Sequence, residues 1–156
     1  MDFTPLKYIY RPAEHTAHYT LLLLHGTGGN ETDLFPLAAQ LGSNYNLLGV
    51  RGNVSEGGMP RFFRRLGMGV FDEQDLHFRT DELVASIKAI AAKEGFDPAK
   101  VIALGYSNGA NIAGATLIKY PGFLAGAILY RPMRPFSSIE SAGTTKKFRY
   151  FSVRER

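Results

Sequence analysis

The sequence contains no cysteine, and this absence excludes a disulfide-stapled fold, a thiolate zinc site and a cysteine nucleophile. It also lacks a long apolar run: residues 21–24, four leucines, fall far short of the ~20 residues that a membrane-spanning helix needs. The first residues lack the basic start and apolar stretch of a signal peptide. We therefore expect a cytoplasmic protein without a membrane partner, whose residues 1–156 form a single domain.

Acidic residues are scarce only towards the end of the chain. The formal net charge is +4, yet residues 1–130 hold eleven Lys and Arg against twelve Asp and Glu. Residues 131–156 hold seven Lys and Arg against two Glu, so the whole excess lies there. These cations follow neither helical nor strand spacing, which disfavours a nucleic-acid interface. We expect no nucleic-acid partner.

Short apolar runs alternate with longer amphipathic segments along the chain. This alternation is typical of an α/β fold, a mostly parallel sheet with helices on both faces. We expect strands at residues 19–24, 46–50, 101–104 and 124–130. We expect helices at residues 32–41, at 80–95 with Thr80 as the N-cap, and at 110–120. Residues 55–75 show no clean period and contain several glycines, which predicts a long lid or substrate loop.

Residues 105–109, Gly-Tyr-Ser-Asn-Gly, match the pattern G-x-S-x-G between an expected strand and an expected helix. The pattern has a steric origin, because the serine is at the apex of a tight strand-to-helix turn and side chains two residues away would meet the backbone. A plain glycine turn is the alternative, and the strand-to-helix context disfavours it. Ser107 is therefore the candidate nucleophile.

A second glycine-rich loop, residues 25–29 (His-Gly-Thr-Gly-Gly), follows the leucine-rich strand. A serine hydrolase needs two backbone N–H groups for the oxyanion, one from the residue after the nucleophile and one from such a loop. Asn108 and Thr27 are the candidates. A dinucleotide-binding loop is disfavoured because Glu31 stands where the third glycine should fall. His25 precedes the glycines, and we expect it to brace the loop.

These motifs, together with Arg51-Gly-Asn and residues 58–65 (Gly-Met-Pro-Arg-Phe-Phe-Arg-Arg), resemble the phospholipase/carboxylesterase family of α/β-hydrolases. They resemble most its small bacterial branch linked to hydroquinone and quinone stress. The resemblance covers residues 10–147 and implies a serine carboxylesterase of small or acyl esters, without a metal or other cofactor. It implies Ser107 as nucleophile and Thr27 and Asn108 as oxyanion-hole donors. Near the acyl or alcohol pocket it places Arg61, Phe62, Phe63, Arg64 and Arg65.

The sequence lacks the rest of the catalytic triad at the place where the family carries it. In this fold the serine is followed along the chain by Asp or Glu and then by His. After Asn108 there is no aspartate and no histidine, and the only acids are Glu140 and Glu155. A triad role for any of the upstream residues His15, His18 and His77 would break that chain order.

The last residues offer an explanation for the missing triad members. Residues 146–156 have no turn or period that suits the next strand, and they hold much of the excess positive charge. We hypothesise a member of the family that is frame-shifted or truncated after about Lys147, so that the C-terminal part of the fold is missing. We expect self-association through the edge of such an incomplete sheet.

Two functions remain open on these grounds. The first is a serine carboxylesterase-type hydrolase acting on a small-molecule ester, weak or inactive as this 156-residue chain. The alternative is a non-catalytic ligand-binding or partner-dependent protein that retains the hydrolase pocket.

Overall fold

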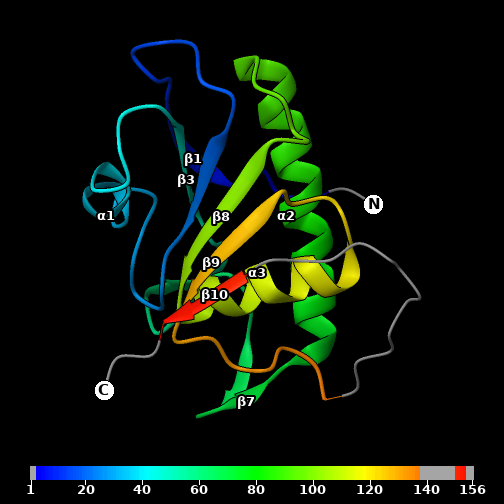
Figure 1. Ribbon diagram of the computed structural model, residues 1–156. Helices are drawn as coiled ribbons and strands as arrows, with labels where there is room; N and C mark the ends of the chain where they lie inside the picture. Colours follow the sequence, from blue (N-terminus) through cyan, green and yellow to red (C-terminus); the bar gives the residue numbers. More distant parts are fainter. Residues whose placement is uncertain (1–2, 138–149, 154–156) are drawn as a thin grey trace.

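The computed structural model describes residues 3–137 and 150–153 (Figure 1). Six strands of the described chain form one sheet in the order β1-β3-β2-β8-β9-β10. Only β1 runs antiparallel to its neighbour, and the other strands pair in parallel. The strands are β1 (Lys7–Arg11), β2 (Thr20–Leu24), β3 (Asn46–Arg51), β8 (Val101–Tyr106), β9 (Gly126–Tyr130) and β10 (Tyr150–Val153). The prediction of a mostly parallel α/β sheet is confirmed.

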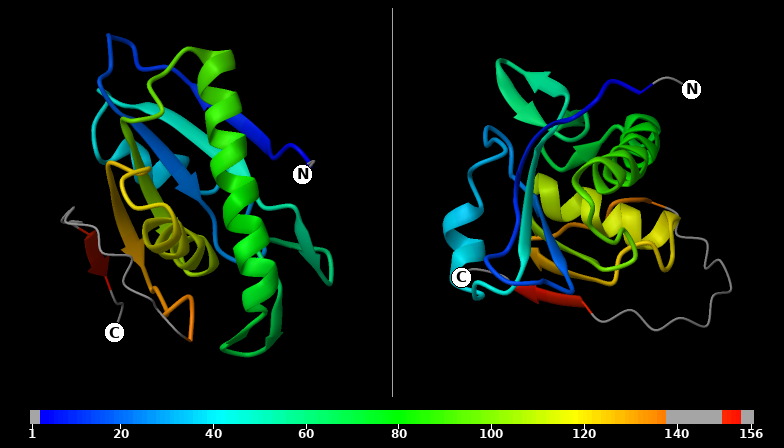
Figure 2. Two further views of the ribbon diagram at one scale, coloured as in Figure 1. Left: turned by 90° about the vertical axis from the view of Figure 1, so that its right-hand side faces the viewer. Right: turned by 90° about the horizontal axis from the view of Figure 1, so that it is seen from above.

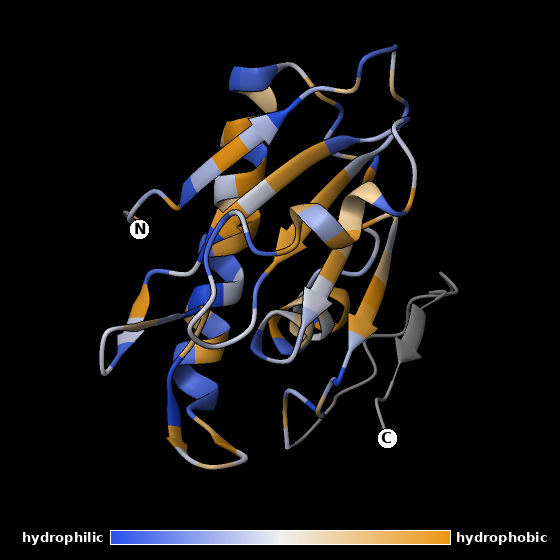
Figure 3. Cartoon of the chain, turned by 90° about the vertical axis from the view of Figure 1, so that its left-hand side faces the viewer, coloured by the Kyte–Doolittle hydropathy of each residue, from blue (hydrophilic) through white to orange (hydrophobic). Residues whose placement is uncertain are grey.

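Helices cover both faces of this sheet, as expected. Figure 2 shows α1 (Phe35–Ala39) on one side, with α2 (Glu73–Glu94) and α3 (Asn108–Lys119) on the other. All five residues of β2 are buried. Because alternate strand residues point to opposite faces, Leu22 and Leu24 pack in the core beneath α2 and α3, whereas Leu21 and Leu23 pack beneath α1. Figure 3 shows the hydrophobic strands in orange.

The stretch expected to be a long irregular loop contains two small hairpins. The first joins β4 (Val54–Glu56) to β5 (Met59–Arg61), and the second joins β6 (Arg65–Gly67) to β7 (Val70–Phe71). Gly57 and Gly58 both have positive φ, 57° and 83°, as a two-residue hairpin turn requires. At the end of the first hairpin, residues 60–62 lie beside the loop that follows β2, where the Pro60 carbonyl accepts a hydrogen bond from the backbone N–H of Gly28.

Helix α2 begins two turns earlier than the sequence pattern predicts, so Thr80 is not its N-cap. The N-cap is Asp72, whose side chain accepts a hydrogen bond from the backbone N–H of Asp75 at 3.1 Å. Thr80 is buried in the helix interior and donates its hydroxyl to the Leu76 carbonyl. The first turns are mostly charged or polar, so their hydrophobic period is weak. The expected end at Gly95, with φ of 84°, is confirmed.

Two strands of the central sheet were not predicted, in addition to the four short hairpin strands. Strand β1 is at the sheet edge, and only part of each of its middle side chains is buried, which blurs the strand period. Strand β10 corrects the expectation that residues 146–156 suit no strand, because residues 150–153 pair in parallel with β9. Lys147, Glu140 and Glu155 lie outside the described residues.

The remaining boundaries differ by a few residues from those expected. The first helix is shorter than residues 32–41, and α3 starts two residues before the expected position 110. None of the helices in the described part of the chain is both long enough and apolar enough to cross a membrane.

Candidate active site

Ser107 lies at the junction between β8 and α3 in a backbone conformation that side chains rarely adopt. Its φ is 52° and its ψ is −108°. Among the described residues only Ser107 and Arg131 combine a positive φ with a side chain. Such a conformation costs about 1–3 kcal/mol and persists only where the surrounding structure enforces it. The serine is therefore on a strained turn, partly exposed, at the carboxyl end of a central strand.

The two glycines of the motif make this turn possible. A Cβ added to Gly105 would lie 2.7 Å from the backbone N of Ala110, and one added to Gly109 would lie 2.0 Å from the carbonyl oxygen of Leu24. Both neighbours are backbone atoms, so neither can move aside cheaply. The steric reason for the G-x-S-x-G spacing is thus visible at both positions.

The glycine loop after β2 lies beside this turn. Strands β2 and β8 pair in parallel, with Leu24 opposite Gly105, so the loops that follow them start at the same end of the sheet. A Cβ on Gly26 would lie 2.9 Å from the ring of Tyr106. The fold therefore brings Thr27 to the same end of the sheet as Ser107 and Asn108. Asn108 is the first residue of α3, where backbone N–H groups have no acceptor within the helix and favour negative charge.

His25 has the structural role that the sequence suggests. Its side chain is buried, and its Nε2 accepts a hydrogen bond from the backbone N–H of Gly52 at 3.1 Å. Nδ1 must then carry the proton, which it donates to the Gly26 carbonyl at 2.6 Å. Burial lowers the pKa of His25, which keeps the ring neutral. Both nitrogens are occupied in bracing the two loops.

The other described histidines lie elsewhere, and His15 is exposed in the loop between β1 and β2. His77 is exposed on α2 and stacks on Phe136 with ring centroids 4.4 Å apart. His18 lines a cavity of about 250 Å³ with Thr20 and Lys100, at the end of the sheet where β2 and β8 begin. Ser107 lies at the opposite end. None of the hydrogen bonds that the described histidines form reaches the Ser107 hydroxyl.

Residues 61–63 are buried beside the candidate oxyanion residues. The Nη1 of Arg61 donates to the hydroxyl oxygen of Thr27 at 2.5 Å, and its Nε donates to the Phe63 carbonyl at 3.0 Å. The backbone N–H of Phe62 donates to the side-chain oxygen of Asn108 at 2.7 Å. Burial lowers the pKa of Arg61. These three side chains are at most 3% exposed in the structure.

The chain resembles known hydrolases in both sequence and structure. No protein-family model matches it. A curated protein of Bacillus subtilis named "Putative hydrolase MhqD" is 53% identical over 135 residues, which are 86% of this chain and 66% of that protein. The solved Bacillus cereus carboxylesterase superposes with a TM-score of 0.84 at 50% identity, over 86% of this chain and 64% of that one. The chain belongs to the carboxylesterase family of α/β-hydrolases.

A carboxylesterase from Mesorhizobium loti is similar as well, with a TM-score of 0.80 at 30% identity, over 86% of this chain and 64% of that one. The chain thus spans slightly less than two thirds of the length of these family members. Its strained Ser107 turn and the glycine loop after β2 both lie within the shared part of the α/β-hydrolase fold.

Arg64 and Arg65 are nearer the surface of this family member than Arg61. Arg65 forms an ion pair with Glu56 at 2.6 Å, and this hydrogen bond lowers the pKa of the Glu56 carboxyl. Arg64 is exposed, but its backbone N–H donates to Asp75 at 2.8 Å. Contact of residues 61–65 with a substrate stays a prediction.

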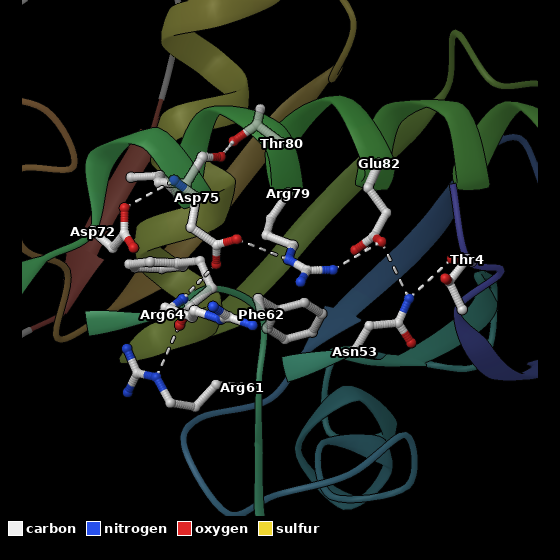
Figure 4. A network of polar contacts seen from close by, with 12 residues as sticks. Thr4, Asn53, Arg61, Phe62, Arg64, Asp72, Asp75, Arg79, Thr80 and Glu82 are labelled. Carbon is white, nitrogen blue, oxygen red and sulfur yellow. Dashed lines mark hydrogen bonds and ion pairs between the residues drawn. The ribbon is translucent and has the colours of Figure 1, made fainter. Parts of the chain in front are cut away.

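A chain of polar contacts anchors this stretch to α2 (Figure 4). Asp75 accepts from Arg79, and Arg79 donates to the buried carboxylate of Glu82. Glu82 also accepts from Asn53, whose amide reaches the Thr4 carbonyl. Burial raises the pKa of Glu82. This network was not predicted from the sequence, although acids and an arginine at helical spacing in residues 75–82 were a signal for it.

Exposed apolar side chains gather beside the hairpin β6–β7. A Cβ on Gly69, at the hairpin turn, would lie 3.7 Å from Met133 Cε, three residues beyond β9. The Tyr130 carbonyl at the end of β9 accepts the backbone N–H of Ser107, which places this segment next to the candidate nucleophile. The large apolar side chains exposed here are Leu66, Met68, Val70 and Met133, which we call the apolar rim.

In the part of the chain that the structure describes, no group of three or more His, Cys, Asp or Glu side chains is arranged to hold a metal ion.

Proposed function

We propose that this chain is a serine carboxylic-ester hydrolase in which Ser107 is the nucleophile. The observation that carries the proposal is the strained backbone of Ser107, at the carboxyl end of β8 and beside the glycine loop after β2. That position presents the hydroxyl at the carboxyl end of the strands, where α/β-hydrolases carry out their chemistry. The membership in the carboxylesterase family points to the same reaction.

The reaction is acyl transfer in two steps. The Ser107 oxygen bonds to the ester carbonyl carbon and loses its proton, and the alcohol leaves with a proton when the tetrahedral intermediate collapses. The backbone N–H groups of Thr27 and Asn108 donate hydrogen bonds to the negatively charged oxygen of that intermediate. Water then hydrolyses the acyl-enzyme and restores the serine. The substrates are small or acyl esters, no cofactor takes part, and we place the protein in the cytoplasm.

Turnover by the 156-residue chain is weak in this proposal. A serine hydroxyl is a poor nucleophile without a neighbouring base, and the histidine contacts among the described residues supply none. An oxyanion hole and substrate binding alone leave a rate about 10³–10⁴-fold above that of water. That residual rate does not depend on the serine, so we expect the intact chain to exceed it through attack by Ser107 and still to turn over far more slowly than an enzyme with a complete triad.

A second candidate function is a non-catalytic module that binds an ester-like ligand. The specific observation in its favour is that both nitrogens of His25, the histidine nearest the candidate site in the chain, are already hydrogen-bonded. Such a module would keep the site and lack the proton transfer.

Hydrolysis of 4-nitrophenyl acetate separates the two functions. We compare the intact chain with Ser107→Ala and with Ser55→Ala, a matched control at an exposed position on β4. If the chain is a hydrolase, we expect a saturable rate that Ser107→Ala lowers to the residual rate of the oxyanion hole and Ser55→Ala retains. A rate that is the same in all three proteins would overturn the hydrolase proposal and favour the binding module.

A further inference from the structure

Three consecutive residues contact both halves of the candidate oxyanion hole. The Pro60 carbonyl accepts the backbone N–H of Gly28 at 3.0 Å. The guanidinium of Arg61 donates to the Thr27 hydroxyl at 2.5 Å. The backbone N–H of Phe62 donates to the Asn108 side chain at 2.7 Å. We call residues 60–62 the bridging segment, because they join the loop after β2 to the turn after β8.

The bridging segment is itself held firmly. Arg61 is 3% exposed, and its Nε donates to the Phe63 carbonyl at 3.0 Å while Glu56 lies 3.7 Å away. A Cβ on Gly52 would lie 2.1 Å from the Arg61 carbonyl oxygen, so the backbone after β3 packs directly against the backbone of Arg61. The ring of Phe62 packs on His25 with centroids 4.5 Å apart. The segment therefore has little room to move independently of the two loops.

We propose that Arg61 is a positioning residue of this active site, and that the bridging segment sets the separation between the N–H groups of Thr27 and Asn108. The inference rests on the proposed function, since it gives those two N–H groups the oxyanion as their acceptor. Hydrogen-bond donors aimed at a developing charge are effective only when their geometry is fixed beforehand. The loop at residues 25–29 and the turn at Ser107 also approach each other directly, since a Cβ on Gly26 would lie 2.9 Å from the Tyr106 ring, and the bridging segment adds hydrogen bonds to both.

The chemistry of the guanidinium suits this role. Arginine presents several N–H donors in a planar fork and stays charged, so it can bond Thr27 and the Phe63 carbonyl at the same time. Because its side chain is buried and hydrogen-bonded to the Thr27 hydroxyl, we assign Arg61 a role that it exerts through Thr27. This differs from a pocket-lining role for the same arginine.

The kinetic test compares Arg61→Met with Arg79→Met. Arg79 is the control because it is also an ion-paired arginine of low exposure, it lies on α2, and it contacts neither Thr27 nor Asn108. Bonds to the oxyanion form only in the transition state, so a displaced donor lowers kcat and leaves KM nearly unchanged. With 4-nitrophenyl acetate we expect Arg61→Met to lower kcat about 10- to 100-fold. Equal changes in the two variants, or a loss confined to KM, would overturn the proposal.

A second readout does not depend on activity. Amide hydrogen exchange, followed by nuclear magnetic resonance in the intact chain, reports the Gly28 N–H that bonds to Pro60. In Arg61→Met we expect Gly28 to exchange about tenfold faster relative to strands β8 and β9. In Arg79→Met that ratio should not change. If Gly28 behaves alike in both variants, the bridging role is wrong. If the intact chain hydrolyses no ester while this difference persists, the proposed function fails and the bridge stands.

Discussion

The side-chain oxygen of Asn108 accepts a hydrogen bond from the backbone N–H of Phe62, 46 residues earlier in the chain, at 2.7 Å. This bond ties the turn that carries Ser107 to a hairpin that is not part of the G-x-S-x-G motif. The side-chain Nδ2 of the same residue is buried and has no hydrogen-bond partner among the described residues. The geometry of the candidate site therefore depends on a contact that the local motif does not contain.

Replacing Gly109 by alanine should unfold the turn, because the new Cβ would lie 2.0 Å from the Leu24 carbonyl oxygen. We expect a loss of about 3 kcal/mol or more in the free energy of unfolding, measured by urea denaturation. Gly114→Ala is the matched control in the same helix, where the Cβ meets only Pro135 at 3.9 Å. It should gain about 0.5–1 kcal/mol. A Gly109→Ala protein as stable as Gly114→Ala would contradict the steric account of the turn.

Acid should lower the free energy of unfolding through protonation of His25. Burial lowers the pKa of its ring below the ordinary value of 6.5, so between these two pKa values the unfolded chain binds more protons than the folded one. The stabilising contribution is complete above pH 6.5 and is lost as the pH falls towards the folded-state pKa, with a slope of at most about 1.4 kcal/mol per pH unit.

Urea denaturation between pH 7.5 and pH 5 measures this slope. His25→Gln should be less stable at neutral pH and should show a smaller loss on acidification. His18→Gln, at an exposed position before β2, serves as the control and should keep the full loss. A loss on acidification as large in His25→Gln as in the unchanged chain would contradict the assignment.

Much of the central fold is predictable from the sequence, because buried parallel strands are continuous apolar runs. The leucines of β2 form such a run, and the glycines around Ser107 are an equally strong local signal for the strand-to-helix turn. The start of α2 is harder to predict, since its first turns are charged and their positions are fixed by Asp72 and the ion pairs of Arg79. Strand β1 is equally difficult, because an edge strand buries its side chains only in part.

The candidate site is likewise predictable only in the part that local motifs encode. The candidate residues Ser107, Thr27 and Asn108 follow from motifs whose spacing reflects local sterics, and parallel pairing of β2 with β8 then brings them together. The contacts of Arg61 and Phe62 with those loops are long-range, and no local pattern encodes them. The family resemblance placed residues 61–65 near a pocket, but only the structure gives their hydrogen bonds.

The apolar rim should select for long acyl chains. Met68 is 85% exposed and Met133 is 50% exposed, so both can cover an apolar chain that leaves the ester bond. Each buried methylene contributes about 0.8 kcal/mol. We expect Met68→Ser/Met133→Ser to lower kcat/KM for 4-nitrophenyl octanoate about tenfold and to have a smaller effect on the acetate. Leu41→Ser, exposed beyond α1, is the control. Equal losses for both esters would contradict this role.

The outer edge of β10 should promote self-association. This strand is last in the described sheet order and pairs only with β9. An unpaired strand edge is a template for another chain. We expect light scattering to report a mass that rises with concentration. A monomeric mass at every concentration would contradict this expectation.

Covalent labelling of Ser107 tests the central claim most directly. The intact chain is incubated with a fluorophosphonate probe and digested, and the modified residue is identified by mass spectrometry. The account expects one adduct, on Ser107, formed more slowly than in a complete triad enzyme and lost in Ser107→Ala. Labelling requires attack of the serine oxygen on phosphorus, which is slow without a neighbouring base and is assisted by N–H donors that stabilise the developing charge. No adduct at Ser107 after prolonged incubation, with the chain folded, would contradict its assignment as nucleophile.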